Sequence, residues 1–293
     1  MARILLIGAG GQLGTDLRSV LPSDTLVPLT RADLDVTDRE AIEQILARHR
    51  PAWVLNTAAF HRVDDIEKDE RGEAQLAFSV NAVAARHLAI ACERRGARLL
   101  QLSTDYVFGG GPPGPYAEDA SPAPLSVYGA SKLAGELLVR QAGSRHVIVR
   151  SSGLYGVAGS AGKGGNFVET MLKLADAGKP IRVVDDQVLT PTYTADLARA
   201  IAGLIASNPP GGIYHLSNSG QCSWYEFARA IFALCRRTPE LEPTTSAEFD
   251  APARRPPQSV LRNTRAASLG VPLLPPWREA LEAYLRVKKH RVD

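Results

Sequence analysis

The chain has 293 residues, 45% of them hydrophobic and 22% charged, which is enough for one elaborated α/β domain or two small domains. Its net charge of +3 is too small to indicate nucleic-acid binding, and no run approaches about 18 apolar residues, so we expect no membrane span. The three cysteines, Cys92, Cys222 and Cys235, lack CxxC spacing, so we expect buried thiols and neither a disulfide framework nor a metal site.

The first half of the chain alternates strand and helix signals. Short apolar runs predict strands at residues 3–7, 25–29, 53–59, 98–103 and 146–151, and helical spacing predicts helices at 12–21, 38–49, 73–95 and 127–141. Thr37 or Asp38 is placed to cap the second helix. The first apolar run is only four residues long and ends in glycines, so it indicates a buried strand and not a secretion signal, and we expect a cytoplasmic protein. This alternation predicts a doubly wound parallel α/β sheet of the Rossmann type.

The second half is less regular. Residues 153–165 are rich in glycine, and residues 239–257 are rich in proline and polar side chains, which predicts a loop. Two further β/α units are expected, at 181–184 with 194–205 and at 212–216 with 224–235. We therefore divide the chain into a Rossmann region at residues 1–152 and a smaller substrate-binding lobe at 153–293, partly interleaved with the sheet. The lobe is expected over the carboxyl ends of the strands, where such sheets bind ligands.

A glycine-rich turn follows the first predicted strand. It fits GxxGxxG with Gly8, Gly11 and Gly14, and Gln12 and Leu13 open the next helix. Without side chains the backbone can turn sharply, and a pyrophosphate can approach the helix N-terminus, whose free N–H groups attract anions. Between a strand and a helix, this spacing predicts a dinucleotide-binding turn, with a merely structural tight turn as the alternative.

Cofactor preference is expected at the end of the second strand. An acidic side chain there would bind the ribose hydroxyls of NAD, but this chain has Thr30 and Arg31. Arg31 can pair with a 2′-phosphate, which favours NADPH, and NADH remains possible if Arg31 is only a surface residue. Asp35 and Val36 follow closely enough to lie beside the adenine.

Tyr128 and Lys132 form a YxxxK pattern inside the helix predicted at 127–141. Four residues are about one helical turn, so both side chains lie on one face. A free tyrosine has a pKa of about 10, and a nearby ammonium together with the positive ring of an oxidised nicotinamide would lower it. Behind the glycine turn, the pattern predicts Tyr128 as the proton-transferring group and Lys132 as its partner and a nicotinamide-ribose ligand. A chance surface pair is the alternative.

A third element is expected at the end of the fourth strand, in the stretch Ser103-Thr104-Asp105. The carboxyl end of a parallel strand favours a binding site over core packing. We assign Thr104 as a hydroxyl that donates a hydrogen bond to the carbonyl being reduced, beside Tyr128. The nearby Tyr106 and Phe108 are expected to pack.

These motifs resemble those of the extended short-chain dehydrogenase/reductase superfamily and, within it, the dTDP-4-dehydrorhamnose reductases. The resemblance covers nearly the whole chain. It rests on GxxGQLG at 8–14, DLDVTD at 33–38, NTAA at 56–59, Val63-Asp64 before Glu67, Val80-Asn81, STDYVF at 103–108, PLSVYGASKLAGE at 124–136, Gly165-Asn166-Phe167, Asp186-Gln187 before Pro191-Thr192, GIYH at 212–215, and Arg255-Pro256 ahead of Leu261.

The resemblance implies transfer of a hydride from NADPH or NADH to C4 of a nucleotide-linked keto-sugar, with a proton from Tyr128. The implied reaction converts dTDP-4-dehydro-L-rhamnose to dTDP-L-rhamnose in polysaccharide biosynthesis. The implied cofactor contacts, besides the glycine turn, are Ala58, Ala59, Phe60, Ser103 and Lys132, and the implied substrate contacts are Thr104, Asp105, His61, Gly153, Asn166 and Arg255.

Two departures from the family pattern bear on the sugar pocket. The family usually has a tryptophan after the Arg-x-Ser that ends the fifth strand, where this chain has Gly153. The wall that often contains Ala-Ala-x-Thr has Phe60 and His61 here, so His61 is a second acid or a polar wall residue. The carboxylates that bind a metal at the dimer contact of some relatives are not recognisable.

Two other functions stay open. A related sugar-nucleotide epimerase or dehydratase is one, although dehydratases commonly place Glu after the Asp that follows the catalytic Thr, where this chain has Tyr106. The regulatory subunit of methionine adenosyltransferase also resembles this family and serves as a binding partner, and a stable complex with a synthetase chain would identify that role. For a reductase we expect a nucleotide-linked keto-sugar as substrate and no nucleic-acid or membrane partner, with a homodimer as one possible assembly.

Overall fold

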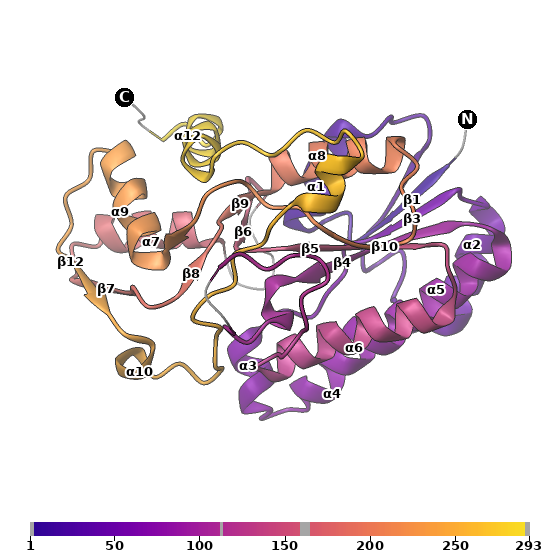
Figure 1. Ribbon diagram of the computed structural model, residues 1–293, viewed down its shortest axis with the longest axis horizontal. Coiled ribbons are helices and arrows are strands. Elements are labelled where there is room, and N and C mark those ends of the chain that lie inside the picture. Colours follow the sequence, from indigo (N-terminus) through magenta and orange to yellow (C-terminus); the bar gives the residue numbers. More distant parts are fainter. Residues whose placement is uncertain (1–2, 112–113, 159–164, 291–293) are drawn as a thin grey trace.

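The centre of the molecule is a sheet of six parallel strands in the order β10–β5–β4–β3–β1–β2 (Figure 1). The computed structural model describes residues 3–111, 114–158 and 165–290. The strands are β1 (Ile4–Ile7), β2 (Leu26–Leu29), β3 (Trp53–Asn56), β4 (Arg98–Thr104), β5 (His146–Ser151) and β10 (Gly212–His215). The strand order reverses between β1 and β3, which is where doubly wound sheets bind ligands. The predicted Rossmann-type sheet is confirmed.

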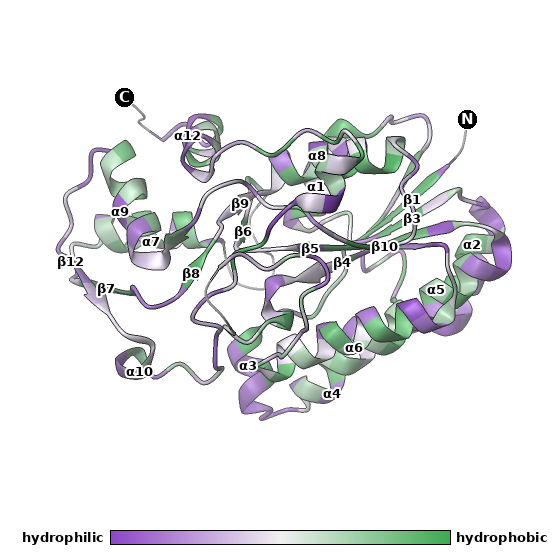
Figure 2. Cartoon of the chain, viewed as in Figure 1, coloured by the Kyte–Doolittle hydropathy of each residue, from purple (hydrophilic) through white to green (hydrophobic). Residues whose placement is uncertain are grey.

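Helices cover both faces of the sheet because successive side chains of a strand point to opposite faces. Leu5 and Ile7 pack into the core beneath α2 (Arg39–His49), α5 (Ala84–Arg95) and α6 (Val127–Ala142). Leu6 packs into the core beneath α1 (Gln12–Val20) and α8 (Thr194–Ala206). In Figure 2 apolar residues dominate the centre of the sheet, whereas polar residues gather at the periphery, as on α2.

The helix predicted at 73–95 is interrupted. α4 (Glu73–Phe78) passes into a π-helical turn at Ser79–Val83 before α5 begins. This turn packs tightly against α6, since a Cβ on Gly135 would stand 2.1 Å from the main-chain oxygen of Asn81. Apolar spacing continues through the segment, so no local pattern indicates the wider turn. Such turns are frequent at functional sites.

Two capping side chains define where important helices begin. Asp38, one of the two predicted caps, accepts a hydrogen bond of 3.0 Å from the main-chain nitrogen of Ala41 at the start of α2. Ser126 accepts one of 3.2 Å from Gly129 at the start of α6. A cap of this kind contributes about 1 kcal/mol. Because α6 begins at residue 127, Tyr128 lies in its first turn.

A separate hydrophobic core holds the C-terminal lobe together. α7 (Phe167–Asp176), α9 (Trp224–Leu234) and α12 (Trp277–Val287) pack around Tyr155. Three two-stranded sheets complete the lobe: β6 (Leu154–Tyr155) with β9 (Thr192–Tyr193), β8 (Val188–Leu189) with β11 (Cys222–Ser223), and β7 (Ile181–Val184) with β12 (Leu241–Thr244). In Figure 1 the lobe lies beyond the carboxyl ends of β4 and β5.

Several elements differ from the prediction, most of them in the second half of the chain. The strand at 181–184 does not join the main sheet but pairs with β12, and the predicted loop at 239–257 contains β12 and α10 (Ser246–Phe249). β10 does join the main sheet beside β5, so α8 and β10 belong to the Rossmann layers although they follow residue 152. α3 (Val63–Lys68) and α11 (Thr264–Ser268) were not predicted, and residues 159–164 of the glycine-rich stretch lie outside the described residues.

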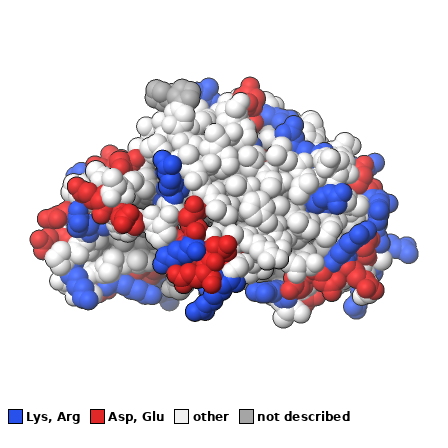
Figure 3. Space-filling model, turned by 90° about the horizontal axis from the view of Figure 1, so that it is seen from below, with Lys and Arg blue, Asp and Glu red and all other residues white. Residues whose placement is uncertain are grey.

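The face formed on the side of α3, α4 and α6 has few charged side chains across its middle (Figure 3). α4, the π-helical turn and α6 expose Leu76, Phe78, Val83 and Leu137, each with 38% to 53% of its surface accessible.

No described helix has the length and apolar character needed to cross a membrane. The three cysteines are buried and unpaired, as predicted.

Candidate active site

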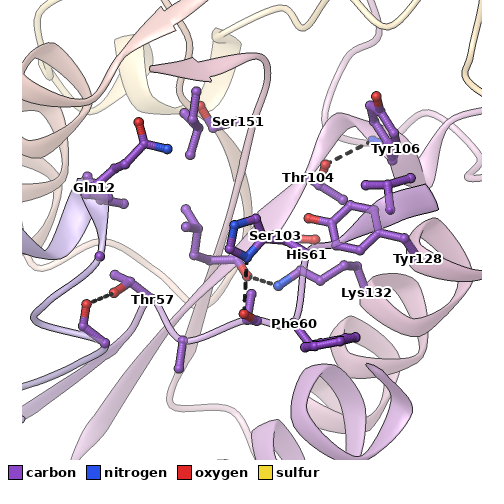
Figure 4. A pocket seen from close by; sticks show the side chains of 18 of the residues that line it. Gln12, Thr57, Phe60, His61, Ser103, Thr104, Tyr106, Tyr128, Lys132 and Ser151 are labelled. Carbon is purple, nitrogen blue, oxygen red and sulfur yellow. Dashed lines mark hydrogen bonds between the residues drawn. The ribbon is translucent and has the colours of Figure 1, made fainter. Parts of the chain in front are cut away.

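A cavity of about 660 Å³ runs along the carboxyl ends of the sheet strands and continues under the C-terminal lobe. All the residues assigned from the sequence to catalysis, cofactor or substrate line it: Gly8, Gly11, Gln12, Leu13, Gly14, Arg31, Asp35, Val36, Ala58, Ala59, Phe60, His61, Ser103, Thr104, Asp105, Tyr128, Lys132, Gly153, Asn166 and Arg255. Figure 4 shows Gln12 and Thr57 on one side of this cavity and Thr104, Tyr128 and Lys132 on the other. The fold therefore brings the three predicted groups of residues together.

The glycine turn has two structural glycines and one that faces open space. Gly8 has a φ of +82°, and a Cβ there would stand 2.7 Å from Oγ1 of Thr57. A Cβ on Gly14 would stand 2.2 Å from the main-chain oxygen of Gly8, so Gly14 lets α1 pack against the end of β1. A Cβ on Gly11 would meet only that same oxygen, at 3.4 Å. The surface at Gly11 is therefore free for a ligand.

The N-terminus of α1 fits an anionic group. Gly11 provides no capping side chain, and no acidic residue lies in the first turn. Free N–H groups at a helix start and the helix dipole both favour a phosphate. Two polar atoms lining the cavity, Oε1 of Gln12 and Oγ of Ser151, are buried without a hydrogen-bond partner. These residues fit the pyrophosphate and nicotinamide parts of a dinucleotide.

The carboxylates that follow β2 are occupied by local turns. Asp33 accepts hydrogen bonds from the main chain and the hydroxyl of Thr30, at 2.8 and 2.6 Å. Asp35 likewise accepts from Thr37, at 2.9 and 2.7 Å, and these bonds lower its pKa. Arg31 is exposed where it lines the cavity. At this end of the cavity Arg31 therefore provides a positive charge, whereas Asp33 and Asp35 already accept hydrogen bonds from neighbouring threonines.

Tyr128 and Lys132 project from the first turns of α6. Tyr128 is half-buried, and its hydroxyl is hydrogen-bonded to that of Thr104. Nζ of Lys132 donates a hydrogen bond of 2.7 Å to the main-chain oxygen of Leu102. Burial lowers the pKa of Lys132 to about 8, although the nearby Glu136 partly offsets this effect.

The expected effect of Lys132 on Tyr128 is not found in the protein alone. Burial raises the pKa of Tyr128, the Thr104 hydrogen bond opposes that rise, and the nearby Asp105 and Tyr106 add to it. The physical reason is that the Lys132 ammonium is directed to Leu102, while the Tyr128 hydroxyl lies in a poorly solvated position. A tyrosine with a raised pKa keeps its proton at neutral pH, which suits a proton donor.

Beside Tyr128, Asp105 is a carboxyl with only 2% of its surface exposed. The Thr104 hydroxyl donates to its Oδ1 at 3.1 Å, and the Ser152 hydroxyl donates to its Oδ2 at 2.8 Å. A third hydroxyl, from Ser259 of the C-terminal lobe, also hydrogen-bonds to it. Burial raises the pKa of Asp105 despite these bonds.

The two aromatic residues expected to pack behave differently. Phe108 is fully buried and stacks on Tyr116 with ring centroids 4.0 Å apart, so its packing role is confirmed. Tyr106 lines the cavity, with its ring edge-on to that of Tyr128 at 5.7 Å. Its hydroxyl is hydrogen-bonded to Arg255. Tyr106 therefore belongs to the wall of the site.

A buried ion pair supports the site from below. Glu136 of α6 and Arg150 of β5 are each 2% exposed and joined at 2.6 Å, with a second bond of 2.9 Å. Ser103 donates a hydrogen bond of 2.5 Å to Glu136. The pair therefore fixes β4, β5 and α6 relative to one another next to Thr104. In the sequence Glu136 is the last residue of the motif at 124–136, and nothing in that motif indicates its pairing with Arg150.

Asn81, placed inward by the π-helical turn, connects the cofactor wall to α6. Its side chain accepts a hydrogen bond from the Phe60 nitrogen and donates one to the Phe60 oxygen, both at 2.9 Å. It also donates to the Ser131 hydroxyl at 3.0 Å. The wall at Phe60 and the helix that carries Tyr128 are thus held by one buried amide.

Three predicted substrate residues have structural duties as well. Arg255 makes an ion pair of 2.8 Å with Asp64 of α3, which joins the lobe to the Rossmann layers. Asn166 caps α7 and donates to the Gly156 oxygen and the Tyr284 hydroxyl, so its amide is already engaged. Gly153 has a φ of +54°, and its surroundings leave little room for a side chain.

Two aromatic residues where the cavity continues under the C-terminal lobe were not predicted as part of the site. Phe167 and Trp224 both line it, with ring centroids 4.6 Å apart. They arise from α7 and α9, so the cavity does have an indole although Gly153 stands where the family usually has one. Gln187 also lines this end. Phe167 and Gln187 belong to motifs that carry the family resemblance, but neither was assigned to the site. No pattern near Trp224 in the sequence indicates a pocket.

The parallel sheet, the glycine turn and the Tyr128–Lys132 pair together define a Rossmann-fold oxidoreductase of the extended short-chain dehydrogenase/reductase type. Comparison with known proteins gives the particular family. The model of the RmlD substrate binding domain family matches residues 2–289, and the chain belongs to this family.

Named relatives are similar over nearly their full lengths. The dTDP-4-dehydrorhamnose reductase of Streptomyces griseus is 42% identical over 95% of this chain and 91% of its own length. The spore coat polysaccharide biosynthesis protein SpsK of Bacillus subtilis is 40% identical, with both chains fully covered. The crystal structure of a dTDP-4-dehydrorhamnose reductase from Bacillus anthracis in complex with NADP is 39% identical, with a TM-score of 0.91 and coverage of 98% of this chain and 100% of that one.

Proposed function

We propose that this protein reduces the C4 keto group of a nucleotide-linked 6-deoxy sugar, dTDP-4-dehydro-L-rhamnose above all, to the alcohol with NADPH. The observation that carries the proposal is the meeting of Tyr128, Thr104 and Lys132 in one cavity with the glycine turn. The family and the names of the relatives support the same reaction.

Each residue then has a chemical task. Bound NADPH supplies the hydride, and Tyr128 gives its proton to the carbonyl oxygen that becomes the hydroxyl. Thr104 donates a hydrogen bond that polarises this carbonyl, and Lys132 binds the nicotinamide ribose. The start of α1 at Gly11 binds the pyrophosphate.

The rest of the cofactor and substrate contacts follow from their positions along the cavity. Arg31 pairs with the 2′-phosphate, Asp35 and Val36 lie along the adenosine, and Ala58 to Phe60 form the opposite wall. The lobe at 153–293 binds the nucleotide-sugar, while α8 and β10 within that range support the sheet. A homodimer and a cytoplasmic location stay predictions.

A panel of nucleotide-linked 4-keto-sugars tests the proposal. Each is incubated with NADPH, loss of absorbance by the reduced cofactor is followed, and the configuration of the product is determined by NMR. We expect dTDP-4-dehydro-L-rhamnose to give the fastest oxidation and dTDP-L-rhamnose as product. Failure to oxidise NADPH with every member of the panel, or release of water instead of reduction, would contradict the proposal.

A further inference from the structure

Two side-chain amides, those of Asn166 and Gln187, line the cavity where it continues under the C-terminal lobe. Both N–H groups and the oxygen of Asn166 already take part in hydrogen bonds within the lobe. Gln187 is only 7% exposed, and within the described residues its side chain makes one hydrogen bond, from Nε2 to Oγ of Ser246 at 2.8 Å. The oxygen and the second N–H of Gln187 are therefore left for a ligand.

The Ser246 hydroxyl fixes the orientation of the Gln187 amide. It donates its only proton to Oδ1 of Asp186 at 2.7 Å, because a carboxylate can only accept. Ser246 must therefore accept from Gln187, which places the amide nitrogen, and not the oxygen, on that side. Ser246 is itself held by its main-chain nitrogen, which donates to both carboxylate oxygens of Asp186, at 3.0 and 2.8 Å. Gln187 thus offers a ligand one defined order of donor and acceptor.

An aromatic surface lies next to this amide. The antiparallel register of β8 and β11, continued by one residue, places Gln187 next to Trp224. Trp224 packs on Phe167 with ring centroids 4.6 Å apart, and Phe167 stacks on the fully buried Phe227 at 5.7 Å. Trp224 and Phe167 are partly exposed and line the cavity. The pair therefore provides a supported surface on which a planar ring can stack.

The charges around this surface suit a neutral ligand group. Asp185 and Asp186 precede Gln187 but do not line the cavity, and each accepts a hydrogen bond from a serine hydroxyl of the lobe. Among the described residues of the lobe, Arg255 is the one charged side chain that lines the cavity, and it is paired with Asp64 at 2.8 Å. The surface beside Gln187 therefore fits a neutral, planar ring with a hydrogen-bonding edge.

We propose that Gln187, Trp224 and Phe167 form the subsite for the base of the nucleotide-sugar, and that Gln187 selects thymine or uracil. The inference rests on the proposed function. The base stacks on the aromatic pair, its N3–H donates to Oε1 of Gln187, and the second N–H of the amide donates to O4 of the base. Cytosine presents the opposite order, with an acceptor at N3 and a donor at N4. With the amide held by Ser246, cytosine leaves these polar groups unpaired.

The nucleotides dUDP and dCDP test this subsite because they differ only in the hydrogen-bonding edge of the base. Their Kd values are measured by calorimetry with NADPH at saturation, so that the cofactor end is occupied. We expect the parent to bind dUDP about tenfold or more tightly than dCDP. Gln187→Leu should weaken dUDP binding about three- to tenfold, change dCDP binding little and leave the Kd for NADPH unchanged. Gln258→Leu changes a glutamine that does not line the cavity and should alter none of these values.

Ser246→Ala separates the orientation of the amide from contact with the ligand, because Ser246 does not line the cavity. Without the hydroxyl, the Gln187 amide can rotate by half a turn and offer its nitrogen to N3 of cytosine. We expect dCDP to bind this variant about threefold or more tightly than the parent, as for one hydrogen bond gained, while dUDP binding does not improve. A variant that was merely misfolded would bind both nucleotides less tightly.

Equal affinities of the parent for dUDP and dCDP would overturn the proposal. Equal losses of both nucleotides in Gln187→Leu would also overturn it, since Gln187 would then only support the lobe, and so would dCDP binding that does not tighten in Ser246→Ala. A parent that prefers dUDP but reduces no keto-sugar contradicts the proposed function and leaves the base subsite intact. A parent that reduces dTDP-4-dehydro-L-rhamnose but binds dUDP and dCDP equally overturns the subsite alone.

Discussion

The two ends of the cavity are built by different means. At the cofactor end, Gly8, Gly11 and Gly14 lie in one short stretch between β1 and α1, and the binding surface is largely main chain. At the sugar end, the part under the C-terminal lobe where we propose that the nucleotide-sugar binds, Trp224 and Arg255 come from segments far from Tyr128 in the sequence.

This difference determines where substitutions can be tolerated. A Cβ on Gly14 would stand 2.2 Å from a main-chain oxygen, and main chain cannot give way without moving β1. At the sugar end, Gly153 stands in place of the family tryptophan, while Phe167 and Trp224 offer aromatic surface from other helices. Side chains at the sugar end can therefore change one at a time without movement of the main chain.

The largest effect is expected at Tyr128, where the two ends meet. Tyr128→Phe removes the proton donor and little contact surface, so kcat should fall by about 10²–10⁴. The Kd for NADPH, measured by fluorescence titration, should be nearly unchanged. Full activity in the Phe variant would rule out Tyr128 as the acid, and a parallel loss of NADPH binding would show that it belongs to the cofactor end.

The next largest effect is expected on the free energy of unfolding, at the buried ion pair of Glu136 and Arg150. Arg150→Met leaves Glu136 charged and buried, and breaking such a pair costs about 3–5 kcal/mol. Urea unfolding should detect this loss of stability. Arg182→Met breaks the exposed pair with Glu248, 3.0 Å apart, and should cost at most about 1 kcal/mol. If both variants lose similar amounts of stability, the buried pair contributes no more to stability than the exposed pair does.

A smaller, selective effect is expected at the cofactor end. A charge-assisted contact to a 2′-phosphate contributes about 1.5–3 kcal/mol, so Arg31→Ala should weaken NADPH binding at least about tenfold and leave NADH binding nearly unchanged. The Kd of each cofactor measures this. Arg18→Ala, an exposed arginine of α1 that does not line the cavity, is the control. Equal Kd values for the two cofactors in the parent would show that Arg31 does not recognise the phosphate.

The smallest effect is expected at the sugar end, where contacts are shared among several side chains. Trp224→Ala should raise the KM for the nucleotide-sugar about two- to tenfold, as for loss of one aromatic contact worth about 0.5–1.5 kcal/mol, and leave the KM for NADPH unchanged. His61→Ala should act in the same direction. Phe249→Ala changes an aromatic that is 58% exposed outside the cavity and should alter neither value. If Trp224→Ala has the same kinetics as the parent protein, Trp224 does not contact the nucleotide-sugar.

Local patterns in the sequence determined the Rossmann sheet and the elements that carry the chemistry. Alternating strands and helices, the glycines after β1, and one helical turn between Tyr128 and Lys132 are features of neighbouring residues, so periodicity and spacing were sufficient to predict them. The apolar pattern also placed the cap of α2 at Thr37 or Asp38, and the structure shows that it is Asp38.

Tertiary structure alone decided how these parts are held together. Asn81 meets Phe60 and Ser131, Glu136 meets Arg150, and β7 meets β12, and each pair is separated by a stretch of chain that contains no signal of the contact. The pKa of Tyr128 likewise depends on its burial and on Thr104, Asp105 and Tyr106, which the fold places around it. Desolvation and long-range hydrogen bonds depend on which surfaces pack against each other, and only the folded chain determines that.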